Sequence, residues 1–326
     1  MKKGFTLIEL LVVIGIIGIL SGVLLSTFKD STESARMAKC KVHLRQLAQA
    51  STAKAMTLTD KGKPSTYPLA GSYLKSERSK SVKANDRHRG WIGYSLSSSG
   101  NGCSPVPFYQ DSGNNAGKSA YEVITNGLLW TWTKCNRALY TCPTYVNYRR
   151  NKGLREPMFT YVMNSYFWYD NTRGTGTSGT AQSTEEDAGI KANEIGNADR
   201  RIMFAELPFP NDKVSPEISD PEDTGDDYQC DCTLQASGKV GNISFEERWP
   251  GVAESIGFPH KIGKHGYCGN VVFCDCHTES IMYPEKSGGL TKEELTVLLC
   301  AGVDYAYANG QYSIAYAADD EDEEQE

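Results

Sequence analysis

Apolar residues run almost unbroken through the start of the chain. After Gly4, residues 5–28 contain a single ionisable side chain, Glu9. About 20 apolar residues suffice for a helix to cross a bilayer, whereas a secretory signal peptide has a shorter apolar region that ends in a small-residue cleavage site. No A-x-A pattern closes this run. We therefore expect residues 5–28 to form a transmembrane helix that the mature protein retains.

Helical periodicity continues beyond this run. Apolar residues recur three or four positions apart up to residue 58, and no Pro or Gly occurs between Lys29 and Asp60. We predict one continuous helix over residues 5–58, roughly 80 Å long at 1.5 Å per residue, with its second half packed on a globular domain. His43 lies beside the apolar stripe and is expected to be solvated. The stripe consists of Met37, Cys40, Leu44, Leu47, Ala48, Ala55 and Leu58.

The remainder of the chain alternates β-prone runs with polar loops. Strands are predicted over residues 90–96, 161–169, 201–207 and 305–316. Stretches rich in Gly, Ser, Thr or carboxylates predict long loops over 97–120, 170–189 and 211–229. Thr291 and Glu294 form a capping box that predicts a helix ending near Cys300. The pattern as a whole indicates an α+β fold with an antiparallel sheet.

One β-hairpin is predicted near the C-terminal end of the chain. Two β-prone runs, 270–274 and 277–281, flank the dipeptide Asp275-Cys276. A two-residue type I′ turn needs positive φ at both positions, which costs a residue other than glycine roughly 1 kcal/mol. We therefore expect either a bond that holds Cys276 in this conformation or a different turn.

Charge and cysteine content narrow the function classes. The net charge of −6 argues against nucleic acid as a partner, because phosphate binding needs a basic surface. Ten cysteines behind an exporting N-terminus indicate disulfides in an oxidising compartment. Cys135 and Cys142 are close enough in sequence to bridge a short loop. No combination of residues indicates catalysis, so we expect a protein that is not an enzyme.

Two groups of residues could hold a metal ion. An oxygen-rich loop could bind calcium, the one cofactor that the sequence suggests. Its spacing fits no EF-hand, however, and a solvated acidic loop is the commoner case. Two C-x-C pairs could bind zinc in a tetrahedral site, but disulfides between the pairs suit an oxidising compartment better. The calcium candidates are Asp220, Glu222, Asp223, Asp226 and Asp227, and the zinc candidates are Cys230, Cys232, Cys274 and Cys276.

The sequence Gly4-Phe5-Thr6-Leu7-Ile8-Glu9-Leu10 resembles the type IV pilin and pseudopilin family. The resemblance implies that prepilin peptidase cuts after Gly4 and that the new amino terminus, on Phe5, is methylated. It also implies that Glu9 pairs with the amino terminus of a neighbouring subunit during assembly. A carboxylate in the bilayer costs about 2.5–3.5 kcal/mol, so such a group usually has a partner.

A second segment is similar to a C-terminal signature of bacterial prepilin-like proteins. His265 is followed after nine residues by Asp275, and His277 matches a trailing histidine. Cys276 departs from the signature, which has glycine at that position. The resemblance implies a pilin-like α+β fold in which a long N-terminal helix packs on an antiparallel sheet with large loops.

The resemblance also implies an organisation and a role. We expect a leader (1–4), a transmembrane and filament-core helix (5–28), its amphipathic continuation (29–58), a globular head (59–316) and an acidic disordered tail (317–326). The chain would be a minor pilin or pseudopilin that joins other such subunits in a type IV pilus or a type II secretion pseudopilus. It would sit in the bacterial inner membrane by a single pass, with its head periplasmic or extracellular. The alternative is a membrane-anchored, surface-displayed protein whose loops bind a carbohydrate or cell-surface ligand.

Overall fold

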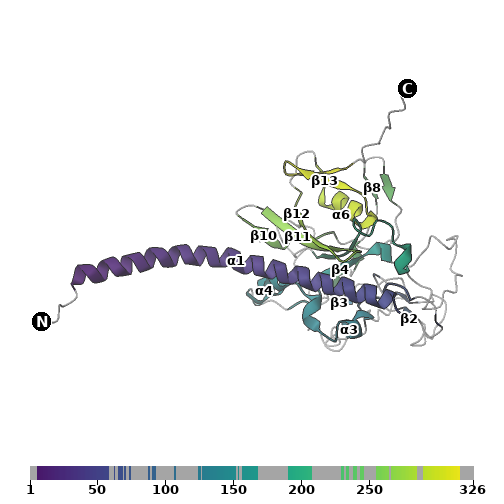
Figure 1. Cartoon of the computed structure of the whole chain (residues 1–326), viewed down its shortest axis with the longest axis horizontal. Helices are drawn as coiled ribbons and strands as arrows, with labels where there is room; N and C mark the ends of the chain where they lie inside the picture. Colours follow the sequence, from purple (N-terminus) through teal and green to yellow (C-terminus); the bar gives the residue numbers. More distant parts are fainter. Residues whose placement is uncertain are drawn as a thin grey trace, which may run out of the picture.

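A long helix and a globular head make up the structure (Figure 1). The computed structural model describes residues 6–58, 62, 65–68, 70, 73–74, 87–88, 90–92, 106–107, 124–125, 127–151, 153, 156–167, 190–207, 229–230, 233–234, 238–240, 243–245, 255–263, 266–284 and 289–315. The N-terminal half of helix α1 projects away from the head, and its C-terminal half lies along the head (Figure 1). The fold class is α+β, as the sequence pattern predicts.

Helix α1, Leu7–Ala55, is continuous over 49 residues, which confirms the predicted long helix. Thr6 caps its start through a capping box with Glu9. Along the projecting half, large apolar side chains are exposed, from Leu7 (81%) to Leu20 (57%). Along the other half, one face is fully buried in the head, including Cys40, Leu44, Leu47 and Ala48.

Two predictions for this helix need correction. Leu58 is 68% exposed, because the helix ends at Ala55 and the apolar stripe ends with it. His43 is buried rather than solvated, and its Nδ1 lies 3.1 Å from the carbonyl oxygen of Thr141. Among the described residues, no helix combines the length and the apolarity needed to cross a membrane. The predicted transmembrane segment over 5–28 is therefore not confirmed.

A six-stranded sheet forms the centre of the head. Its strands are β4 (Tyr161–Asn164), β5 (Ile202–Glu206), β7 (Thr233–Leu234), β10 (His260–Ile262), β11 (Gly266–Phe273) and β12 (Thr278–Met282). Their order is β10-β11-β5-β4-β7, and β12 pairs with β11. All pairs are antiparallel except β4 with β7. The predicted strands over 161–169 and 201–207 are thus present, the first of them shorter than expected.

Small two-stranded sheets surround this centre. They pair β1 (Tyr73–Leu74) with β2 (Arg87–His88), β3 (Val106–Pro107) with β6 (Gln229–Cys230), β8 (Gly238–Val240) with β9 (Ile243–Phe245), and β13 (Tyr305–Ala308) with β14 (Gln311–Ile314). The single strand predicted over 305–316 is wrong. Asn309 and Gly310 both have positive φ, at 53° and 80°, so an Asn-Gly turn folds this segment into a hairpin.

Short helices complete the head. In the described residues they include α3 (Leu129–Trp132), α4 (Pro143–Asn151), α6 (Lys292–Ala301) and the 3₁₀ helices Arg137–Tyr140, Ser165–Phe167 and Ala192–Glu194. The Thr291–Glu294 capping box before α6 confirms the predicted helix start. The described part of the strand predicted over 90–96 is a buried bend at Trp91 and Ile92.

The core lies between α1 and the sheet. Trp91 is fully buried there, stacked on Tyr140 at 6.0 Å and edge-on to Phe204 of β5 at 5.1 Å. All five residues of β5 are buried. This apolar packing holds the C-terminal half of α1 on the face of the sheet and thereby positions the polar residues that it encloses.

The predicted hairpin is present between β11 and β12, with a different turn. The amide of Cys276 donates to the carbonyl of Phe273 at 2.9 Å, and the amide of Phe273 donates to the carbonyl of His277 at 2.9 Å. Within this turn only Cys276 has positive φ, at 71°. The loop therefore has three residues and one left-handed position, an arrangement that requires a single unfavourable φ rather than the two of a type I′ turn.

Candidate functional site

The start of α1 carries the residue that the family resemblance assigns to assembly. Glu9 Oε2 accepts hydrogen bonds from the Thr6 amide at 2.7 Å and from the Thr6 hydroxyl at 2.8 Å. Its neighbours Leu7, Ile8 and Leu10 are all exposed. The predicted processing residues, Gly4 and Phe5, lie outside the described part of the chain. The structure thus places a carboxylate near the tip of an exposed apolar helix.

The metal sites predicted from the sequence fall largely outside the described residues. All five calcium candidates (Asp220, Glu222, Asp223, Asp226 and Asp227) do so, as does Cys232. Cys230 belongs to β6, which pairs with β3. Cys274 is buried and Cys276 is half-buried at the β11–β12 turn. The calcium site and the zinc site therefore stay predictions. The predicted disulfides between the two C-x-C pairs are not present, because Cys274 and Cys276 are free.

The C-terminal signature has a structural role where it can be described. His265 lies outside the described residues. Asp275 Oδ1 accepts a hydrogen bond from the amide of His277 at 3.0 Å and lies 2.5 Å from its ring Nδ1. The His277 ring stacks on Phe273 with 4.3 Å between ring centroids. These contacts fix the hairpin turn.

Seven of the cysteines in the described part of the chain are free: Cys40, Cys135, Cys142, Cys268, Cys274, Cys276 and Cys300. Cys135 is exposed and has a positive φ of 57°, whereas Cys142 is buried. The predicted Cys135–Cys142 bridge is therefore not present. The core encloses Cys142 among groups that the sequence did not associate with it.

Four polar residues from distant parts of the chain meet in the core. Cys40 comes from α1, Cys142 directly precedes α4, Glu206 ends β5, and His260 begins β10. One potential ligand atom from each residue lies within 4.8 Å of the others, and all four residues are buried. Glu206 Oε1 lies 2.7 Å from Cys40 Sγ and 2.9 Å from His260 Nε2. Cys142 Sγ lies 3.7 Å from the same His260 nitrogen. We call these four residues the core cluster.

Neighbouring groups hold the core cluster from outside. His260 Nδ1 lies 2.8 Å from Glu33 Oε1, which also accepts a hydrogen bond from the Thr144 hydroxyl at 2.6 Å. Glu206 Oε2 accepts a hydrogen bond from the amide of Asn270 at 2.6 Å. These contacts hold His260 through Nδ1 and Glu206 through Oε2. The second polar atom of each side chain is thereby directed toward the other cluster members.

Further contacts reach the cluster from β4 and from the surface. The Tyr161 hydroxyl lies 3.1 Å from Cys40 Sγ. Arg36 forms an ion pair with Glu33 at 3.3 Å. Glu33 therefore links the positive charge of Arg36 to His260, and both Arg36 and Glu33 are partly exposed to solvent.

Burial and charge shift the titration of these groups. Burial by itself disfavours the charged imidazole, but the negative charge of Glu206 and hydrogen bonds with Cys142, Glu206 and Glu33 raise the pKa of His260 far above its usual value. Burial also raises the pKa of the Cys40 thiol, and the nearby Cys142 and Glu206 act in the same direction. The environment thus keeps a proton on Cys40 and on His260.

Sequence reasoning missed the core cluster. Its members are separated by 64 residues or more in the chain, apart from the 54 residues between Glu206 and His260, so no spacing motif unites them. One signal was available. Glu206 lies inside the strongly apolar run 202–207, and a carboxylate in a buried strand needs a partner. Periodicity placed Cys40 on the buried stripe but gave no sign of its neighbours.

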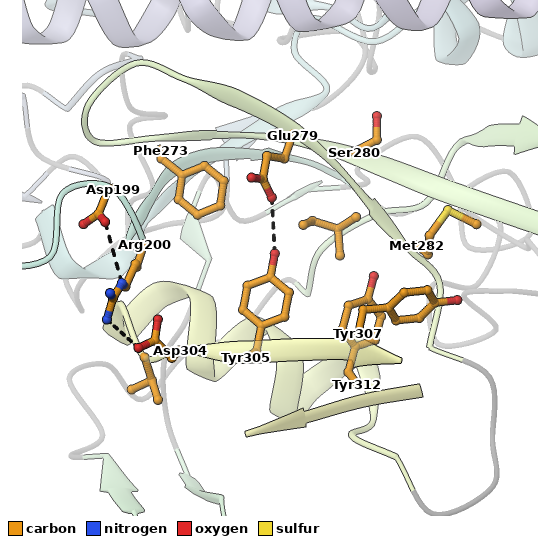
Figure 2. Close-up of a pocket in the computed structure, with 12 residues that line it drawn as sticks. Asp199, Arg200, Phe273, Glu279, Ser280, Met282, Asp304, Tyr305, Tyr307 and Tyr312 are labelled. Atoms are coloured by element: carbon orange, nitrogen blue, oxygen red, sulfur yellow. Dashed lines mark hydrogen bonds and ion pairs between the residues drawn. The ribbon is translucent and has the colours of Figure 1, made fainter. Parts of the chain in front are cut away.

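A separate cleft opens on the surface between β12 and the β13–β14 hairpin. It has a volume of about 390 Å³. Figure 2 shows Arg200 between Asp199 and Asp304 at one end, with Tyr305, Tyr307 and Tyr312 along the hairpin. Arg200 is ion-paired to both aspartates, and the Tyr305 hydroxyl lies 3.5 Å from Glu279. Each charged side chain labelled in the cleft therefore already has a partner within the protein.

Comparison with known proteins identifies one segment of the chain. Residues 1–25 match the family described as the prokaryotic N-terminal methylation motif. No curated protein and no solved structure matches the chain. The match supports a type IV pilin-like protein, and it covers the same segment that carries Glu9.

Proposed function

We propose that the chain is a structural subunit of a filament, a minor pilin or pseudopilin of a type IV pilus or a type II secretion pseudopilus. Prepilin peptidase would cut it after Gly4 and the amine of Phe5 would be methylated. The observation that carries this proposal is the match of residues 1–25 to the N-terminal methylation motif. The proposed role requires no catalytic residues.

The projecting half of α1 supports assembly through this helix. Large apolar residues on it are exposed on every side, including Leu11 (58%), Ile14 (59%) and Ile19 (71%). A helix that is apolar all round needs a bilayer or other apolar helices around it. A filament core of such helices buries this surface, and the inner membrane does so before assembly. The C-terminal half of α1 is locked into the head, so the head follows the helix into the filament.

Glu9 would select the register of assembly. In the single subunit its carboxylate is occupied by Thr6 in the capping box. In a filament, the amine of Phe5 from a neighbouring subunit would supply a positive charge for it. In a surrounding of low dielectric constant this charge pair is far stronger than in water, so a subunit without the Glu9 charge assembles poorly.

The runner-up function, a surface-displayed protein that binds a carbohydrate or cell-surface ligand, depends on the loops over 97–120, 170–189 and 211–229. Apart from the β3 strand at 106–107 and the first residue of β6, these loops lie outside the described residues. It stays a prediction.

The experiment separates the charge of Glu9 from its capping role. Glu9→Gln keeps a side-chain oxygen that can complete a capping box but removes the charge. Thr6→Ala removes the cap and keeps the charge. Each variant is expressed in the native bacterium, and the subunit is quantified by immunoblot in sheared filaments and in membranes.

We expect Glu9→Gln to lower the filament fraction about tenfold, which corresponds to 1.4 kcal/mol, with normal processing and membrane level. Thr6→Ala should lower the filament fraction less than about twofold. Normal incorporation of Glu9→Gln contradicts the charge role. Equal losses in the two variants assign Glu9 to capping and contradict it as well.

A further inference from the structure

We propose that the core cluster of Cys40, Cys142, Glu206 and His260 is a structural zinc site inside the head. The proposal concerns the stability of the head and does not depend on the filament role. The four side chains converge on one buried point from α1, from the residue before α4, from the end of β5 and from the start of β10.

The chemistry of the donors selects the metal. The cluster offers two thiolates, one imidazole nitrogen and one carboxylate oxygen, all of which are zinc ligands. Calcium and magnesium take oxygen ligands and do not suit a site with two sulfur atoms. Sites of sulfur and nitrogen in a tetrahedral arrangement are typical of zinc, and four protein ligands leave no open position, as in structural zinc sites.

The spacing of the donors fits a tetrahedron. Zinc bonds of about 2.3 Å to sulfur and about 2.0 Å to nitrogen or oxygen place the ligand atoms roughly 3.3–3.8 Å apart. Cys142 Sγ and His260 Nε2 are 3.7 Å apart, within this range. The Glu206 oxygen is closer, 2.7 Å from Cys40 Sγ and 2.9 Å from His260 Nε2, because it accepts hydrogen bonds from both. A zinc ion would replace the protons in these contacts, so the Glu206 oxygen would need to move about 0.8 Å farther from Cys40 Sγ and about 0.4 Å farther from His260 Nε2.

The groups around the cluster have the arrangement of an outer coordination shell. Ligating histidines almost always direct their second ring nitrogen to a carboxylate or a carbonyl. His260 directs Nδ1 to Glu33 Oε1 at 2.8 Å, which leaves Nε2 facing the cluster. Glu206 is likewise fixed through Oε2 by the Asn270 amide, which leaves Oε1 facing the cluster. Tyr161 places its hydroxyl 3.1 Å from Cys40 Sγ, where it can donate to a thiolate.

The burial of the cluster is consistent with a bound metal ion. Cys40, Cys142, Glu206 and His260 are each fully buried, with 0% of their surface exposed. Buried charges are expensive unless they are paired or coordinate a metal. A zinc ion with two thiolates and one carboxylate leaves a net charge of −1 at the site, and Arg36, ion-paired to Glu33, lies on the neighbouring side. The bound ion would join α1 to two strands of the sheet and so lock the long helix onto the head.

A disulfide between Cys40 and Cys142 is the competing outcome. Their sulfur atoms belong to the same group within 4.8 Å, and an oxidising compartment favours such bonds. A disulfide would remove both sulfur ligands and leave Glu206 and His260 as a buried ion pair. The two outcomes differ in metal content and in mass, so one preparation distinguishes them.

The test uses full-length protein purified in detergent without chelators. Zinc is measured by mass spectrometry of the elements, and the thiol state of Cys40 and Cys142 by alkylation and peptide mapping without reductant. We expect about one zinc per chain, with both thiols protected by the metal. Cys142→Ser and His260→Gln should each lower bound zinc about tenfold or more. Cys300→Ser, which removes a buried thiol outside the cluster, should leave it unchanged.

A second measurement uses the wild-type protein alone, in case a variant does not fold. Zinc is removed with a chelator, and the melting temperature is recorded before and after zinc is returned. We expect the melting temperature to fall and then to recover. Cobalt in place of zinc should give the absorption of a thiolate-bound tetrahedral ion, and this absorption should weaken in Cys142→Ser. A Cys40–Cys142 disulfide, or free thiols without metal, would overturn the proposal.

Discussion

His260 Nε2 lies 2.9 Å from Glu206 Oε1, and both side chains are completely buried. The pair connects the end of β5 to the start of β10 at a point where β11 lies between these strands in the sheet. Because neither side chain is exposed to solvent, water does not screen the charges of the pair. The stability of the head therefore depends on both partners being present.

Removal of Glu206 should be among the most damaging single changes in the head. In metal-depleted protein, Glu206→Ala leaves the His260 charge without its most buried partner and the Asn270 amide without its acceptor. We expect a loss of about 3–5 kcal/mol in the free energy of unfolding by urea. Glu156→Ala, which removes the exposed ion pair with Arg150, should cost less than about 1 kcal/mol. Equal costs for the two variants would contradict the buried pair.

The two halves of α1 should respond differently to the same substitution. Leu44 is fully buried in the head and Leu11 is 58% exposed on the projecting half. Leu44→Ala should lower the free energy of unfolding by about 2–5 kcal/mol, because it opens a cavity. Leu11→Ala should leave this energy unchanged and reduce the amount of subunit in sheared filaments. The division of the helix is contradicted if Leu11→Ala destabilises the head as much as Leu44→Ala.

The turn between β11 and β12 should tolerate glycine at one position only. Cys276 has a φ of 71°, and a left-handed backbone costs a residue with a Cβ atom roughly 1 kcal/mol. Cys276→Gly should therefore raise the free energy of unfolding by up to about 1 kcal/mol. The gain is reduced by the loss of the weak contact between Cys276 Sγ and the Thr52 hydroxyl. Asp275→Gly serves as the control and should be destabilising, because Asp275 bonds to His277. A destabilised Cys276→Gly variant would show that its side chain matters more than its backbone.

Acid should destabilise the head in part through His43. Burial lowers the pKa of His43 below its usual 6.5, despite the hydrogen bond with the Thr141 carbonyl. The neutral form is therefore favoured in the folded protein, and its stability contribution is present above pH 6.5 and is lost as the pH falls through the folded-state pKa. The loss is at most about 1.4 kcal/mol for each pH unit in this window.

His43→Asn tests this contribution, because asparagine keeps a donor for Thr141 and does not titrate. Unfolding by urea is measured for both proteins between pH 7 and pH 5. The difference in stability between wild type and variant should shift in favour of the variant as the pH falls. Parallel curves for the two proteins would rule out His43 as the source of the acid sensitivity.

Hydrophobic periodicity and capping residues predict the helices and strands whose formation depends on neighbouring residues in the sequence. The continuous α1, the capped α6 and the strands β4 and β5 follow from periodicity and from capping residues. The alternation over residues 305–316 resembles one strand because it continues through Asn309-Gly310, although this dipeptide is itself a strong turn signal.

The core cluster could not be predicted in the same way. Cys40 lies on the apolar stripe of α1, and this pattern predicts that it is buried but not which residues it contacts. Cys142 and His260 lie at the ends of secondary-structure elements, where sequence patterns are weakest. Only the packing of α1 against the sheet brings them to Glu206. Glu9, the proposed assembly residue, shows the reverse case, because it lies in the contiguous segment that matches the methylation motif and its identification needs no tertiary structure.

The mass of the mature N-terminal peptide tests the central claim most directly. The protein is isolated from the membrane fraction of its native bacterium and digested, and the N-terminal peptide is sequenced by mass spectrometry. A Gly4→Val variant provides the unprocessed reference. The account predicts a chain that begins at Phe5 with a methyl group on its amine. A chain that begins at Met1 would contradict it.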